Sequence, residues 1–314
     1  MKVEKQDPVI EVATPWDLTV KVEEEEVRRK YGADGRRGIT TTKKSASFRV
    51  DKDTLINASW YFRTMLSGSW NESQTNTILL KGDTLKSMEV WFRALHSTLS
   101  AMPMDSISIA EIWHTIQAGD KYGLDRARLR SGFRTWWSSE ATADRLTDMN
   151  VCRQLMFPAY AFDYTLGFRA VTRALVYNWP GHITEMRPNA IKHNLNSDNK
   201  MHLRPRVIQQ LNATKADLRN KIYRCLFMDF NFILKKAKCT CHEETLCNYL
   251  RELSRIGVQP LGGELPHRSI KDIIDSLGRF NEENMRSKKA PTVRGVHFSS
   301  TTAVFLGSGS HSVY

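Results

Sequence analysis

The sequence predicts an α+β fold in which a small sheet capped by helical hairpins is followed by an all-helical region. Residues 47–99 carry the main signal, because a short strand with Phe48 and Val50 on one face runs directly into a helical pattern. A second apolar strand at 77–80 leads into another helix with a single apolar stripe. From residue 140 onward the apolar periodicity is helical only. The predicted core positions of the first helices are Leu55, Ser59, Phe62 and Leu66, and those of the next helix are Met88, Trp91, Phe92, Leu95 and Leu99.

A further strand is predicted before this stretch. Residues 16–22 alternate apolar and polar side chains, as a half-buried strand does. Residues 23–46 then combine an acidic run at 23–26, a basic run at 28–30 and three glycines, and predict a long hairpin loop that is partly disordered. We interpret the charge block as a solvated linker.

The length of 314 residues allows two modest units, or one domain with a large extension. Pro158 is predicted to begin a helix and Ser269 to cap the last one. The predicted organisation is a flexible tail at 1–14, a first domain at 15–140 with the disordered loop 23–46, a helical extension and linker at 141–200, a C-terminal helical region at 201–280 and a flexible tail at 281–314.

Five short motifs follow one another along the predicted first domain. They are Phe48 with Val50, Ser59-Trp60-Tyr61-Phe62, Trp70-Asn71-Glu72-Ser73, Ile78-Leu79-Leu80 and Gln117-Ala118-Gly119-Asp120-Lys121-Tyr122-Gly123-Leu124. Their order and residues resemble the BTB (POZ) domain, a protein-interaction fold. Two positions depart from the family pattern: Gly119 stands where alanine is usual, and Asp51 follows the strand where the family has a histidine. Blocks in the C-terminal half, such as 158–163 and 239–241, resemble BTB-domain proteins abundant in filamentous fungi.

The resemblance implies a non-enzymatic scaffold or adaptor that self-associates as a homodimer or binds a protein partner. In BTB proteins that recruit a cullin-3 ubiquitin ligase, an apolar-x-Glu turn docks on the cullin's N-terminal helices. By resemblance Trp70 would fill a groove and Glu72 would orient the contact, so a substrate adaptor of a cullin-3 ligase is one alternative. The other interpretation of this turn is that Glu72 caps it while Trp70 packs on the core.

The net charge of +12 suggests a second alternative. Nine Lys or Arg residues lie within 201–238 against two aspartates, so a nuclear regulator could bind nucleic acid through a basic helix at 204–238. No nucleic-acid fold signature accompanies these residues. A solvated helix face is therefore the favoured interpretation, and protein rather than nucleic acid is the expected partner.

One group of residues has the chemistry of metal ligands. Cys239, Cys241, His242 and Cys247 lie within nine residues, and zinc prefers thiolate and imidazole ligands. Their spacing does not match the paired knuckles of a zinc finger, and cysteine is often buried for packing alone. We therefore expect no metal and no other cofactor.

The sequence holds no nucleotide-binding, metalloprotease or serine-hydrolase motif, so we expect no enzyme activity. No apolar run approaches the roughly 20 residues that cross a bilayer, and the first residues carry no secretion signal. An odd number of scattered cysteines fits a reducing compartment. The expected location is cytoplasmic, nuclear or both.

Overall fold

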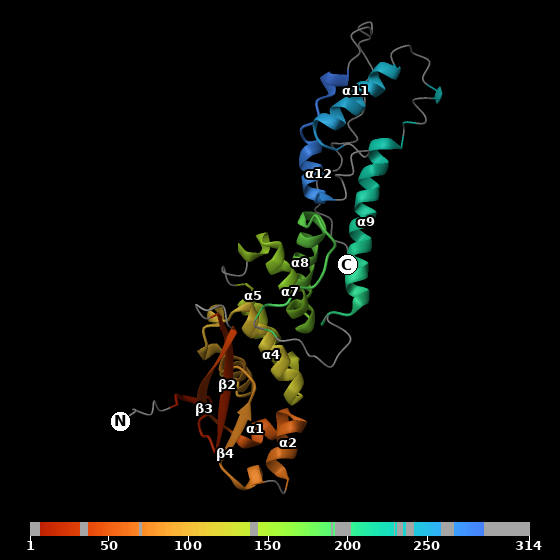
Figure 1. Ribbon diagram of the computed structural model, residues 1–314. Helices are drawn as coiled ribbons and strands as arrows, with labels where there is room; N and C mark the ends of the chain where they lie inside the picture. The colour runs from red at the N-terminus through yellow and green to blue at the C-terminus, as the bar shows by residue number, and fades with distance from the viewer. Residues whose placement is uncertain are drawn as a thin grey trace. The chain divides into compact units, whose positions relative to one another are not determined.

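The computed structural model describes residues 7–31, 37–68, 71–138, 144–189, 191, 202–228, 230, 235–236, 242–258 and 267–285. Within these ranges a mixed sheet with helices is followed by a mainly helical region, which confirms the α+β class (Figure 1). The chain divides into two compact units, Met1–Arg219 and Asn220–Tyr314.

Among the described residues, four strands form the sheet of the first unit, in the order β1-β3-β2-β4. β2 and β3 pair antiparallel, whereas β1 lies parallel to β3 and β4 lies parallel to β2. Over residues 18–23 of β2 and 45–50 of β3 the buried residues alternate with more exposed ones, so one face of this part of the sheet meets the core. The strands are β1 (Val9–Glu11), β2 (Leu18–Tyr31), β3 (Arg37–Val50) and β4 (Thr77–Lys81).

The prediction of a long loop over residues 23–46 is wrong. β2 continues to Tyr31 and β3 begins at Arg37, and the two strands are paired along their whole length. β-Branched residues favour this extended form, among them Val27 and the threonines at 40–42. Residues 32–36, between the two strands, lie outside the described residues.

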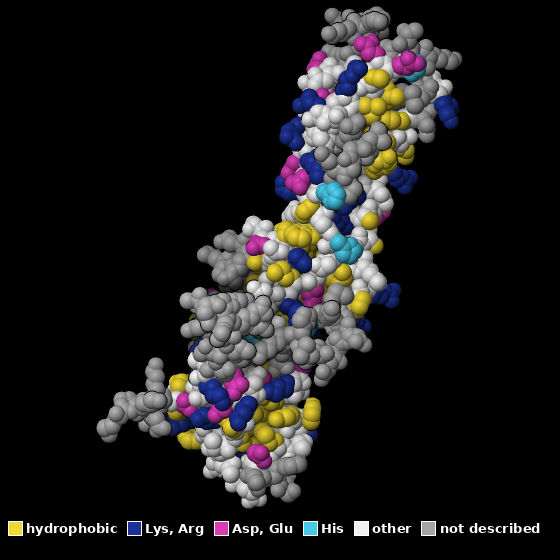
Figure 2. All heavy atoms as spheres, in the orientation of Figure 1, with side chains coloured by type: hydrophobic (Ala, Val, Ile, Leu, Met, Phe, Trp, Pro, Cys, Tyr) yellow, Lys and Arg dark blue, Asp and Glu magenta, His cyan; other side chains and the backbone are white. Residues whose placement is uncertain are grey.

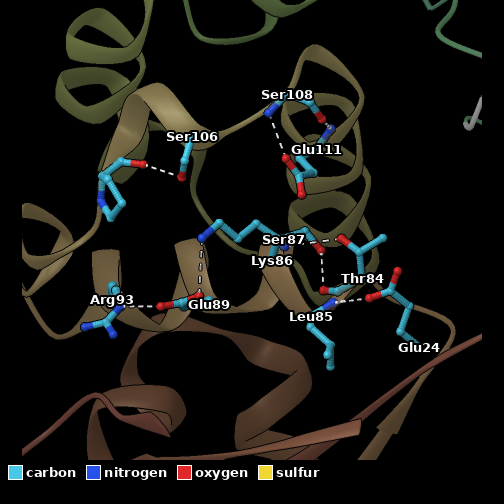
Figure 3. A network of polar contacts seen from close by, with 11 residues as sticks. Glu24, Thr84, Leu85, Lys86, Ser87, Glu89, Arg93, Ser106, Ser108 and Glu111 are labelled. Carbon is cyan, nitrogen blue, oxygen red and sulfur yellow. Dashed lines mark hydrogen bonds and ion pairs between the residues drawn. The ribbon is translucent and has the colours of Figure 1, made fainter. Parts of the chain in front are cut away.

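The acidic run takes part in this pairing. The register places Glu24 opposite Lys44 and Glu25 opposite Lys43, and opposite charges across strands are stabilising. Glu25 and Lys43 form an ion pair with an N–O distance of 3.2 Å. The Glu24 carboxylate also accepts a hydrogen bond from the Leu85 backbone N–H at 3.0 Å, at the beginning of helix α3 (Leu85–Leu95) (Figure 3). A carboxylate is favoured there because it satisfies a free N–H and meets the positive end of the helix dipole.

Helices of the first unit pack on the sheet through the predicted apolar stripes. Phe48, Leu55, Phe62 and Trp91 are all fully buried, as expected for a shared interior. Of the predicted core positions on these helices only Leu99 is not buried, because its helix ends at Leu95. The helices are α1 (Lys52–Ala58), α2 (Trp60–Ser67), α3 (Leu85–Leu95), α4 (Ile109–Tyr122) and α5 (Arg130–Trp137), with short 3₁₀ turns η1 (Asn71–Gln74), η2 (Leu99–Ala101), η3 (Met104–Ser106) and η4 (Arg126–Leu129).

Side-chain caps fix where α1, α2, α3 and α4 begin. Asp51, Ser59, Thr84 and Ser108 each accept a hydrogen bond from a backbone N–H in the first turn of the helix that follows. Ser108 and Glu111 form a reciprocal capping box, which Figure 3 shows beside the Thr84 cap.

Gly119 is explained by the position of Trp91. A Cβ atom at residue 119 would lie 2.6 Å from Cζ2 of the Trp91 ring, closer than such atoms can approach. The ring is fully buried, and its indole N–H donates to the Thr115 carbonyl at 2.7 Å, so it cannot move aside. This contact accounts for glycine at residue 119.

The prediction that Pro158 begins a helix is wrong. It lies inside α7 (Met149–Ala161), where proline cannot donate to the carbonyl four residues earlier. That carbonyl, on Gln154, instead accepts a hydrogen bond from the indole N–H of Trp113 at 3.0 Å. An interior proline is tolerated because a side chain from α4 supplies the missing donor.

The chain after α8 (Thr165–Asn178) is held against the helices of the first unit. Arg153 of α7 donates to the Thr184 carbonyl at 2.9 Å, and the Glu185 carboxylate accepts the backbone N–H groups of His202 and Leu203 at 3.1 and 2.7 Å. The side chain of Glu185 is only 2% exposed. Part of the linker predicted before residue 200 is therefore fixed, and residues 192–201 lie outside the described residues. The last helix of this unit is the first part of α9 (Pro205–Phe227).

The second unit has its own small core. Leu253, Ile256, Val258 and Ile273 are buried together, and α12 is capped at Ser269 as predicted. Glu252 is 2% exposed and accepts hydrogen bonds from Arg255. The elements of this unit are the end of α9, α11 (His242–Arg255), α12 (Ile270–Leu277) and the 3₁₀ turn η8 (Glu282–Met285).

Candidate interaction surface

Ser59 caps α2 and links the beginning of this helix to the end of α4. The Ser59 hydroxyl oxygen accepts the Phe62 backbone N–H at 3.2 Å and donates its own proton to the Tyr122 carbonyl at 2.5 Å. Ser59 is 3% exposed, so this link is protected from water. The first residue of α2 is thereby fixed against the C-terminal end of α4.

That first residue is Trp60, whose side chain is 65% exposed. Its indole lies on the backbone of Gly123, which has φ of +62° and ends α4 in the left-handed conformation. A Cβ atom at residue 123 would be 2.1 Å from Nε1 of Trp60. Tyr61 lies edge-on to Trp60, with ring centroids 6.1 Å apart. Trp60 therefore packs on Gly123 with one side of its indole, while most of its surface is exposed to solvent.

Polar contacts of the residues that end α4 support this site. The Tyr122 hydroxyl donates to the Asp83 carboxylate at 2.5 Å, and the same carboxylate accepts from Nζ of Lys121 at 2.6 Å. Burial, and then the hydrogen bond to Asp83, raise the pKa of Tyr122 well above its usual range. Its ring stacks on Phe62 at a centroid distance of 5.4 Å and meets Tyr61 at 5.0 Å. Tyr122 therefore stays neutral and keeps the end of α4 in place beneath the aromatic surface.

The turn predicted to bind a partner follows α2. Glu72 lies in η1, which packs against α2, and it is exposed. Trp70 lies outside the described residues, so neither of the two interpretations of its role is tested. We define the aromatic surface as Trp60 and Tyr61, at the beginning of α2.

Asp51, which directly follows β3, has a local structural role. Its carboxylate caps α1 by accepting the Thr54 N–H at 2.7 Å, and its own N–H donates to Nε2 of His96 at 3.0 Å. Hydrogen bonds from the Thr54 side chain and backbone lower the pKa of Asp51. His96 in turn contacts the Phe92 carbonyl through Nδ1 at 2.7 Å, so Nδ1 carries the proton and Nε2 is the acceptor. His96, the residue directly after α3, is thus placed beside Asp51.

The basic helix predicted at 204–238 uses two of its charges inside the first unit. Lys215 is 3% exposed, and its ammonium group donates to the carbonyls of Trp179 and Gly181. Arg219 donates to the Pro180 carbonyl at 3.0 Å. Burial, followed by the charge of Arg219, lowers the pKa of Lys215 to about 8. These two side chains are not available to contact nucleic acid, and the support for a binding helix here is weaker than the charge count suggested.

The predicted metal candidates are only partly described. His242 begins α11 and Cys247 is exposed on it, whereas Cys239 and Cys241 lie outside the described residues. In the described part of the chain, no three His, Cys, Asp or Glu side chains are gathered as ligands of one metal ion. None of the described helices is both long and apolar enough to cross a bilayer.

Comparison with known proteins gives no family assignment. No protein-family model and no curated protein matches this chain.

The exposed indole of Trp60 was not selected from the sequence, although a signal was present. With Ser59, Phe62 and Leu66 on the buried face, helical spacing puts Trp60 away from the core. The support from Gly123 could not be predicted, because the two residues are far apart in the chain.

Proposed function

We propose that residues 15–140 are a BTB (POZ) domain and that the protein is a non-enzymatic interaction module. The observation that carries the proposal is the aromatic surface, in which an indole is 65% exposed yet fixed against the backbone of Gly123. Tryptophan is among the residues most enriched at binding hot spots, and a side chain fixed before binding loses less entropy when the complex forms.

The order of elements supports the BTB assignment. The hairpin β2–β3, helices α1 and α2, strand β4 and helices α3 and α4 follow one another as the resemblance requires. Within them the motif residues Phe48, Val50, Phe62 and Ile78 are buried.

The proposed partner is a helical protein surface, and a cullin-3 N-terminal domain is the form that the resemblance favours. Exposed Glu72 lies in η1, the turn that follows α2, and would supply a separate charged contact to the same partner. A homodimer through the same domain is the other form of the proposal.

Calorimetry with a purified cullin-3 N-terminal domain tests the first form. Trp60→Ala and Glu72→Ala should each weaken binding, Trp60→Ala by about thirtyfold, since removing a hot spot costs about 2 kcal/mol. Leu166→Ala is the matched control, because Leu166 is an apolar side chain on α8 that is 68% exposed. Binding that is unchanged by Trp60→Ala would remove this surface from the proposal.

Sedimentation velocity of the full chain tests the second form. A dimer that dissociates when Trp60 is replaced by Ala, but not when Leu166 is, would assign the aromatic surface to self-association. If the chain neither binds the cullin domain nor associates with itself, both forms of the proposal fail.

A further inference from the structure

Two arginines of the second unit share a single hydroxyl oxygen. Arg268, shortly before α12, donates from Nη2 to Oγ of Ser276 at 2.6 Å. Arg279, shortly after α12, donates from its own Nη2 to the same oxygen at 2.8 Å. The two Nη2 atoms are therefore no more than 5.4 Å apart, the sum of these distances. Two positive charges are held close together, although like charges repel.

The hydroxyl group between the two arginines also has a proton to donate. Ser276 is 1% exposed, and its oxygen accepts from both guanidinium groups. Among the described residues, no acceptor contacts the proton of this hydroxyl group. Buried polar groups are normally hydrogen-bonded, and a negatively charged oxygen is the acceptor that suits a donor beside two cations.

The nearby carboxylates are engaged in other contacts. Asp272 closes the capping box at the beginning of α12 and also interacts electrostatically with Arg268. Asp275 forms an ion pair with a lysine of the same helix, and Glu252 binds Arg255. In the described part of the chain Arg279 forms no ion pair, and its side chain is at the surface. The charge of Arg279 is therefore available to an anion from solution.

Arg268 is fixed in place by two backbone carbonyls. Its Nη1 donates to the Gly257 carbonyl at 2.5 Å, and its Nη2 donates to the Asp272 carbonyl at 2.9 Å. Gly257 has φ of +71°, and a Cβ atom there would lie 3.3 Å from Nη1 of Arg268, so glycine favours this close approach. A donor that is positioned before binding loses less entropy when a ligand binds.

We propose that Arg268, Ser276 and Arg279 bind a phosphate group. This site is independent of the aromatic surface and goes beyond the proposed function. A phosphate group carries close to two negative charges, which balance two guanidinium groups, and its several oxygens can accept from both of them at once. A carboxylate has one charge and two oxygens in a plane, and a single arginine already matches it. The ligand class is therefore inorganic phosphate or a phosphate monoester.

Equilibrium dialysis of the full chain against radiolabelled inorganic phosphate tests the proposal. The buffer holds about 0.15 M sodium chloride, which screens long-range attraction to the positively charged chain. We expect one phosphate bound per chain. Arg279→Gln should weaken binding about tenfold, because it removes a hydrogen bond between two charged groups.

Two further variants make the test specific. Arg251→Gln is the matched control, because Arg251 is an exposed residue of α11 that donates to Asn248, and its loss should leave binding unchanged. Ser276→Ala removes the shared oxygen without changing any charge and should also weaken binding. If Ser276→Ala unfolds the second unit by circular dichroism, Arg279→Gln still decides, since the Arg279 side chain is exposed.

Competition with N-acetyl-phosphoserine amide distinguishes the two sources of the phosphate group. Displacement at a lower concentration than inorganic phosphate requires would assign the site to a phosphorylated protein segment, and displacement only at a higher one would assign it to free phosphate. An equal loss of affinity in Arg251→Gln would overturn the proposal, because binding would then follow the net charge of the chain. Unchanged affinity in Arg279→Gln, or no phosphate bound by the wild-type chain, would overturn it as well.

Discussion

The indole N–H of Trp113 replaces a backbone hydrogen-bond donor that is missing from α7. In a regular helix the Gln154 carbonyl would accept the N–H of residue 158, but Pro158 has none. Nε1 of Trp113 donates to this carbonyl at 3.0 Å, and the Trp113 side chain is fully buried. Trp113→Phe would remove that donor as well. We expect a loss of about 1–3 kcal/mol for the unsatisfied acceptor, in addition to the cost of the smaller ring.

A double-mutant cycle isolates the hydrogen bond from the change in ring volume. Pro158→Ala restores an N–H at residue 158, which can donate to the Gln154 carbonyl. In that background Trp113→Phe should cost about 1–2 kcal/mol less than in the wild-type chain, because the acceptor keeps a donor. The loss of ring volume appears on both sides of the cycle and cancels.

Urea unfolding followed by far-ultraviolet circular dichroism provides the free energies, taken from the transition of the first unit. Trp91→Phe is the matched control, since Trp91 is also fully buried and also donates to a helix carbonyl, that of Thr115. Residue 119 keeps its N–H, so the cost of Trp91→Phe should not depend on Pro158→Ala. An equal cost of Trp113→Phe in both backgrounds would refute the explanation of the interior proline.

Two other changes test contacts of the first unit. Gly119→Ala should destabilise the protein by about 1–3 kcal/mol in urea unfolding although alanine is the better helix former, because its Cβ would lie 2.6 Å from the buried Trp91 ring; a gain in stability would contradict this packing. The pKa of Lys215, lowered to about 8 by burial, means that between about pH 8 and its ordinary value of 10.5 the folded protein holds fewer protons than the unfolded chain. The free energy of unfolding should therefore rise with pH in this window relative to Lys215→Met, and equal pH dependence in the two proteins would exclude the shift.

The apolar spacing of the sequence predicted the core helices and strands well. Leu55, Phe62 and Met88 are buried as their spacing predicts, because the apolar residues of each helix share one face. The cap at Ser269 was predicted for a similar reason, since a capping box involves only neighbouring residues.

The predictions were wrong where a contact with a residue distant in sequence determines the local structure. Residues 23–46 have the composition of a solvated loop, but Glu25 and Lys43 become partners only once β2 and β3 pair. Pro158 indicates the beginning of a helix unless a donor such as Trp113 reaches the free carbonyl from another helix. The exposed Trp60 likewise depends on Gly123, 63 positions later, for its support.

The sequence by itself determined the α+β class and the buried faces of its helices, because the spacing of apolar residues along the chain indicates which face of a helix or strand is buried. Only the tertiary structure decided that the charged segment is a paired ribbon, that an indole satisfies the carbonyl freed by Pro158, and that Lys215 is buried against backbone carbonyls. These features join residues distant in sequence, and their free energies depend on register, distance and exclusion of water, which no local pattern contains.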